Sequence, residues 1–124
     1  MDQRPRYSRE ELKEFEVLLL DKRNKAYKEL ESLKSSIKQD STGADNNHGS
    51  LKTLEDGADA LEREQLNQLA ARTMKYIKQI DNALIRIKNN TYGYCVDTGK
   101  LISKQRLKAV PHTQHSIEAK LNKR

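Results

Sequence analysis

The chain has 124 residues, of which 34% are charged and only 5% are aromatic. This balance excludes a thick, multilayered core and favours an elongated helical structure with a narrow apolar seam. No segment has the roughly 18 consecutive apolar residues of a membrane span, and the polar N-terminus lacks the apolar core of a signal peptide. We therefore expect a cytoplasmic protein with no membrane partner, and the single cysteine, Cys95, fits a reducing compartment.

The net charge of +6 is unevenly distributed along the chain. Residues 40–65 carry seven acidic and two basic side chains, a net charge of −5. Residues 66–124 carry twelve basic and three acidic side chains, a net charge of +9, and residues 1–39 are close to balance at +2. Ordinary solvated helix surface would account for any one of these charges, but the separation into blocks favours a partner that offers both charge signs.

The first predicted helix begins after a capping box, in which Ser8 is the N-cap residue and Glu11 returns to its amide. No glycine or proline interrupts residues 9–38, which predicts a helix of about 30 residues. Its apolar positions recur with the heptad spacing of one arm of a coiled coil. They are Leu12, Leu19, Ala26 and Leu33, with Phe15, Leu30 and Ile37 between them.

A polar segment at 40–50 predicts a loop, and a second helix is expected to begin near Asp56–Asp59, where either aspartate could cap it. The second helix is expected to end at Asn89–Asn90. Two arms of similar length predict an antiparallel coiled-coil hairpin over residues 1–90, with a tip loop at about 40–57. The seam positions of the second arm are Leu66, Ala70, Thr73, Ile77, Ile80, Leu84 and Ile87.

Residues 91–124 predict a small C-terminal module. Residues 92–96 and 101–102 have the pattern of a short β-hairpin around a turn at 97–100. Ser103 is expected to cap a short helical turn, and Ser116 a last helix at 117–123. The fold class expected from the sequence is therefore mainly α.

Three motifs resemble the DksA/TraR family of bacterial transcription regulators. They are Ile87-Lys-Asn-Asn-Thr-Tyr-Gly93-Tyr94-Cys95, then Gly99-Lys-Leu-Ile102, then Arg106-Leu107-Lys-Ala-Val-Pro111. The resemblance implies a non-catalytic regulator that binds RNA polymerase directly rather than reading promoter DNA. It also implies a link to the stringent response, insertion of the coiled coil into the secondary channel to modulate initiation, and a degenerate zinc-finger-like module at the C-terminus.

The same resemblance assigns functional residues at the tip of the hairpin. The family has an Asp-x-x-Asp-x-Ala pattern there, which Asp56 and Asp59 match, while Leu61 stands in place of the alanine. Asp56 lies 39 residues before Cys95, about one helical turn closer than in the family pattern, and an ungapped match makes Glu55 the alternative acid. Carboxylates at this tip would act indirectly on the Mg²⁺ held by the polymerase.

The family zinc finger needs four thiolates, and the matching positions here are Cys95, Thr98, Ser116 and Ala119. Hydroxyls are poor Zn²⁺ ligands and a methyl group is none, so we expect that zinc is absent and that the chain has no cofactor. Cys95 is then expected to be a small buried core residue. His112 and His115 have metal-compatible spacing and could join Cys95 or Asp97 in a rearranged site, although ordinary loop histidines are the simpler interpretation.

A basic run in the C-terminal module is expected to contact the polymerase; it comprises Lys100, Lys104, Arg106 and Lys108. Two alternatives remain open, a basic helical hairpin that binds nucleic acid and a coiled-coil scaffold. The basic run lacks interleaved aromatic residues for base stacking. A hairpin whose seam is satisfied internally is expected to be a monomer, and the chain has no phosphate loop or nucleophile–base set of an enzyme.

Overall fold

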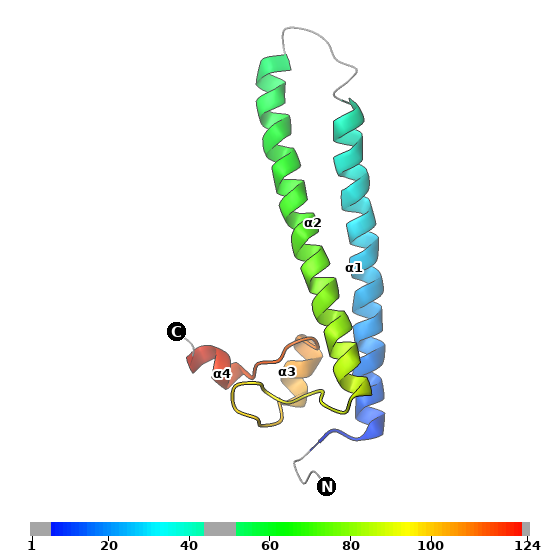
Figure 1. Ribbon diagram of the computed structural model, residues 1–124, viewed down its shortest axis with the longest axis vertical. Coiled ribbons are helices and arrows are strands. Elements are labelled where there is room, and N and C mark those ends of the chain that lie inside the picture. Colours follow the sequence, from blue (N-terminus) through cyan, green and yellow to red (C-terminus); the bar gives the residue numbers. More distant parts are fainter. Residues whose placement is uncertain (1–5, 44–51, 123–124) are drawn as a thin grey trace. The chain divides into compact units, whose positions relative to one another are not determined.

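The computed structural model describes residues 6–43 and 52–122 (Figure 1), and it is mainly helical as expected. The elements in chain order are α1 (Arg9–Gly43), α2 (Lys52–Lys88), α3 (Lys104–Ala109) and α4 (Ile117–Asn122). They form two compact units, one of residues Lys25–Ile77 and one of Met1–Asn24 with Lys78–Arg124. None of the helices in the described ranges is long and apolar enough to cross a membrane.

The start of α1 is fixed by the capping box that the sequence predicts. The Glu11 amide donates to Ser8 Oγ at 3.1 Å, and the Ser8 amide donates to Glu11 Oε1 at 3.0 Å. Two amides of the first turn, which have no partner within the helix, are satisfied in this way. The hydrogen bond that the Ser8 amide donates to the Glu11 carboxylate lowers the pKa of Glu11, and the Ser8 hydroxyl lowers it further.

In the unit of residues 25–77, the two long helices lie side by side and run in opposite directions (Figure 1). The buried core of this unit consists of Ala26, Leu30 and Leu33 of α1 with Ala70 and Ile77 of α2. Thr73 is also buried, and its hydroxyl donates to the Leu69 carbonyl at 2.9 Å, so the polar group is satisfied within α2. The predicted heptad seam is confirmed here.

In the other unit, Phe15 and Leu19 of α1 and Ile80 of α2 are buried. Arg23 joins the two helices through a hydrogen-bonded ion pair, with 2.6 Å between its Nε and Asp81 Oδ1. Leu84 was predicted to lie in the seam, but it is only half-buried, and the neighbouring Ala83 is fully buried instead.

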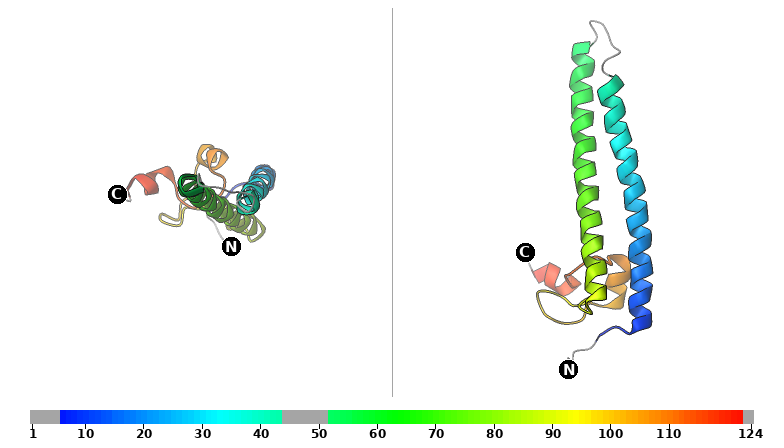
Figure 2. Two further views of the ribbon diagram at one scale, coloured as in Figure 1. Left: turned by 90° about the horizontal axis from the view of Figure 1, so that it is seen from above. Right: turned by 45° about the vertical axis from the view of Figure 1, so that its right-hand side comes forward.

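The C-terminal module folds against the base of the hairpin in the same unit, with α3 beside the last turns of α2 (Figure 2). Its centre is formed by Ile102, Leu107 and Pro111, whose side chains are almost fully buried. Tyr92 connects this centre to the helices, because its hydroxyl donates to the buried Pro111 carbonyl at 2.8 Å. The Tyr7 hydroxyl likewise donates to the Ile102 carbonyl, which attaches the segment before α1 to the module.

Several predicted boundaries differ from the structure. Helix α1 continues to Gly43 and α2 already begins at Lys52, so both extend into the predicted 40–57 loop and neither Asp56 nor Asp59 is an N-cap. Of the predicted β-hairpin, the described residues show one isolated antiparallel bridge, between Tyr94 and Leu101.

Candidate functional site

The tip residues assigned by resemblance lie in the first turns of α2. Asp59 and Leu61 are exposed to solvent, and Leu61 keeps 58% of its surface accessible. Glu55 and Asp56 belong to the same helix, but their side chains lie outside the described part of the structure. The backbone therefore presents the Asp56–Asp59 stretch on a helix rather than in a loop.

The structure brings together three of the four positions that match zinc ligands. Cys95 Sγ accepts a hydrogen bond from the Ser116 amide at 3.4 Å, and the cysteine is 1% exposed, so its predicted burial is confirmed. The hydroxyls of Thr98 and Ser116 also donate to this sulfur. At the fourth position, Ala119 is buried and its amide donates to Ser116 Oγ at 3.1 Å, which caps α4.

The hydrogen bonds around Cys95 stabilise its thiolate. Burial raises the pKa of the thiol, but the amides and hydroxyls of Ser116 and Thr98 outweigh that effect and bring the pKa down to about 6. Next to it, Asp97 Oδ2 lies 2.6 Å from His115 Nδ1 and 4.0 Å from Cys95 Sγ. The interaction of Asp97 with His115 thus joins the turn after Cys95 to the segment before α4.

The predicted basic run is divided between two parts of the module. Lys104 lies against α1, where its Nζ is 3.4 Å from Glu11 Oε2 and 3.7 Å from Glu14 Oε2. Arg106 points to the other side of α3, and its Nε donates to the His115 carbonyl at 3.4 Å. Lys100 and Lys108 are exposed. Only part of the predicted run is therefore available to a partner as one surface.

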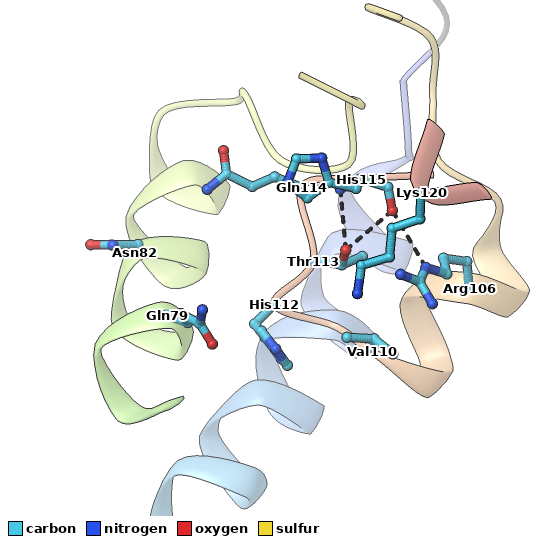
Figure 3. Close-up of a pocket in the computed structure, with 9 residues that line it drawn as sticks. All are labelled: Gln79, Asn82, Arg106, Val110, His112, Thr113, Gln114, His115 and Lys120. Carbon is cyan, nitrogen blue, oxygen red and sulfur yellow. Dashed lines mark hydrogen bonds between the residues drawn. The ribbon is translucent and has the colours of Figure 1, made fainter. Parts of the chain in front are cut away.

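A cavity of about 240 Å³ separates α2 from the C-terminal module (Figure 3). Gln79 and Asn82 approach it from α2, while Arg106 and Lys120 approach it from α3 and α4. None of the residues that line it is acidic. The cations and side-chain amides around this cavity are suited to holding an anionic group.

His112 is one of the residues that line this cavity, and its pKa is lowered by its surroundings. Burial lowers the pKa of His112 first, and the nearby cations Lys22, Arg86, Arg106 and Lys120 lower it further. Arg86 is itself placed by the module, because its Nη2 donates to the His112 carbonyl at 3.3 Å. Arg86 was not among the residues predicted from the sequence; its position directly before the seam residue Ile87 is the signal that could have indicated a contact.

Comparison with known proteins gives matches to one family. Residues 90–120 match the family model described as the prokaryotic dksA/traR C4-type zinc finger. The general stress protein 16O of Bacillus subtilis is 32% identical over 95 residues, which cover 74% of this chain and 53% of that protein. The RNA polymerase-binding transcription factor DksA of Caulobacter vibrioides is 46% identical over 48 residues, 39% of this chain and 34% of that protein. The chain thus spans about half or less of the length of these relatives.

The expectation that zinc and other cofactors are absent is contradicted by the family match, which describes a C4-type zinc finger and points to zinc binding. That expectation rested only on counting thiols at four positions. The donor set at those positions is one thiol, two hydroxyls and one methyl group, which does not fit a four-thiolate zinc. Among the side chains that the structure describes, no three from His, Cys, Asp or Glu are grouped as metal ligands.

The fold agrees with the sequence matches. The structure of the transcription factor DksA2 from Pseudomonas aeruginosa superimposes with a TM-score of 0.80 at 24% sequence identity, over 93% of this chain and 84% of that one. The long helical hairpin and the module at its base are therefore common to both proteins. Together with the match over 90–120 and the two curated relatives, this shows that the chain belongs to the DksA/TraR family.

Proposed function

We propose that this protein is a transcription regulator that binds RNA polymerase directly and inserts the tip of its helical hairpin into the secondary channel to modulate initiation. The observation that carries the proposal is the match to a protein named RNA polymerase-binding transcription factor DksA, which is 46% identical over 48 residues. The role is regulatory and not catalytic, and the protein acts as a monomer without reading promoter sequence.

The hairpin is suited to this role because the apolar residues of its heptad seam are buried. Single apolar side chains such as Val17, Leu61 and Met74 stay exposed, but most of the remaining helix surface is charged or polar. Such a hairpin does not need a second copy to cover its seam. It can therefore enter a polar channel while keeping its own fold.

The acidic block at 40–65 gives the tip its chemistry. This block has a net charge of −5, so a tip that enters the channel brings carboxylates close to the polymerase active site. A polymerase active site holds Mg²⁺ between substrate phosphates, and additional carboxylates beside it alter the field on those ions. We assign this effect to Asp56 and Asp59, which lie three residues apart and therefore on one face of α2.

The test replaces Asp56 and Asp59 by asparagine together and measures polymerase binding and initiation separately. The expected result is binding within about twofold of the wild type, because few contacts are lost, together with loss of the effect on initiation. A matched control, Glu29→Gln with Glu31→Gln, removes the same charge from exposed positions on α1 and is expected to behave like the wild type. Equal effects of tip variant and wild type on initiation would refute the tip assignment.

A further inference from the structure

A second hollow in the module lies between residues 98–103 and the start of α4, and it shares Arg106 with the cavity lined by His112. Its volume is about 460 Å³, and residues from both segments line it. Leu101 and Ile117 contribute apolar surface, Lys100 and Arg106 contribute positive charge, and Glu118 is the one acid among its lining residues. We call this hollow the α4 groove.

The apolar wall of the α4 groove continues along the exposed face of α4. Ile117 is 51% exposed and Leu121, one helical turn later, is 61% exposed. Ala119, on the other face of the helix, is the residue that α4 buries against the module. These two large aliphatic side chains lie four residues apart, on one exposed face beside the hollow, and extend its apolar wall.

The charge around the α4 groove determines what kind of partner fits. Residues 91–124 carry seven basic and two acidic side chains, a net charge of +5. Of the two acids, Asp97 already interacts with His115 at 2.6 Å. The Arg106 guanidinium is held in place by its bond to the His115 carbonyl and carries further N–H groups that can donate to a carboxylate.

We propose that the α4 groove binds an acidic protein segment that inserts one apolar side chain against Ile117 and Leu121 while its carboxylates meet Lys100 and Arg106. A protein segment fits better than nucleic acid, because phosphates would leave the two aliphatic side chains uncovered and no aromatic residue lines the groove for base stacking. The inference rests on the proposed function only in taking RNA polymerase as the protein that carries the segment.

The first experiment uses the full chain, labelled with ¹⁵N, and a short synthetic peptide in which one leucine is flanked by aspartates. Amide shifts are expected to gather in residues 98–103 and 116–121. Replacing the peptide leucine by serine, or Ile117→Ser or Leu121→Ser in the protein, is expected to weaken binding by about tenfold or more. Val17→Ser is the matched control, since Val17 is 61% exposed on α1 away from the groove, and it should leave binding unchanged.

Shifts that are absent or spread over other residues would overturn the proposal, and so would equal binding of the serine peptide. Stronger, salt-steep binding of duplex DNA at the same amides would overturn it in favour of a phosphate-binding surface. The second experiment measures the same variants against bacterial RNA polymerase core enzyme. Peptide binding without polymerase binding would refute the proposed function and leave the groove intact. Wild-type polymerase affinity in Ile117→Ser, together with the expected loss of peptide binding, would refute RNA polymerase as the protein that carries the segment.

Discussion

Phe15 is the aromatic residue through which α1 contacts both the segment before it and the C-terminal module. Its side chain is 1% exposed. The Tyr7 ring packs edge-on against it with 5.3 Å between centroids, and the Tyr92 ring lies 5.5 Å away on a tilted plane. Replacing Phe15 by alanine would open a cavity at the point where these three segments meet, so its effect measures how strongly the module is attached to the hairpin.

The expected destabilisation can be worked out from these contacts. Truncating a buried phenylalanine to alanine costs about 3–5 kcal/mol, and each lost aromatic pair adds about 0.5–1.5 kcal/mol. Because the two pairs share one ring, the terms are not additive, and we expect about 4–5 kcal/mol in all. Val17→Ala, two residues away on the same helix but 61% exposed, should cost less than about 0.5 kcal/mol.

Urea unfolding followed by far-ultraviolet circular dichroism measures both values, and the rate of Cys95 modification by a thiol reagent gives an independent measurement. Cys95 is 1% exposed, so loosening the module in Phe15→Ala should speed its modification strongly, whereas Val17→Ala should not. A Phe15→Ala protein within about 1 kcal/mol of the Val17→Ala control would refute the reasoning, because the aromatic contacts would then not hold the module in place.

Two further predictions concern Gly93 and His112. Gly93 has φ +95°, and an added Cβ would lie 3.1 Å from the Tyr7 ring, whereas Gly99, at φ +72°, has open space. Both Gly→Ala changes should cost about 1–3 kcal/mol in backbone strain, and urea unfolding should show the larger loss at Gly93. Because the pKa of His112 is lower in the folded state, the unfolded state binds more protons below its ordinary value of about 6.5. The free energy of unfolding should therefore fall as the pH drops through that value. His112→Gln should make the free energy of unfolding less dependent on pH in this range. An unchanged pH dependence would contradict the lowered pKa of His112.

The parts of the fold that local chemistry determines were predictable from the sequence. The capping box at Ser8 and Glu11 forms both of its hydrogen bonds, and Ser103 caps α3 by accepting from the Arg106 amide at 3.2 Å. Heptad spacing likewise identified the buried faces of the long helices. These features depend on residues within one or two turns of each other, or on a period that continues along a helix.

The helix ends toward the tip were not predicted correctly because propensity was given too much weight. Residues 39–43 contain serine, threonine, aspartate and glycine, yet α1 includes them. Extending an existing helix by one residue needs no new nucleus, so a weak helix former costs only about 0.5–1 kcal/mol there. The same reasoning explains why α2 begins at Lys52, before the aspartates that seemed to be its caps.

The predicted seam changes where a second contact competes with the heptad. Near the end of α2, the C-terminal module approaches the helix from the side, as the bond from Arg86 to the His112 carbonyl shows. This part of α2 therefore has two neighbours, α1 and the C-terminal module. Ala83 is fully buried there, while Leu84 is only half-buried. No periodicity within one helix contains this information, since the contact depends on a segment more than 20 residues away.

At the candidate site, too, the chemistry depends on contacts between residues that are distant in the sequence. From the sequence, Thr98 and Ser116 were interpreted only as zinc-ligand positions with unsuitable hydroxyls, whereas in the structure they donate hydrogen bonds to the Cys95 sulfur. A thiolate is stabilised by any arrangement that brings positive charge or N–H and O–H dipoles to it, and a metal is only the strongest case. Ligand counting therefore describes one way of stabilising Cys95, while the fold of the 95–116 segment brings the donors together by backbone geometry that no residue count shows.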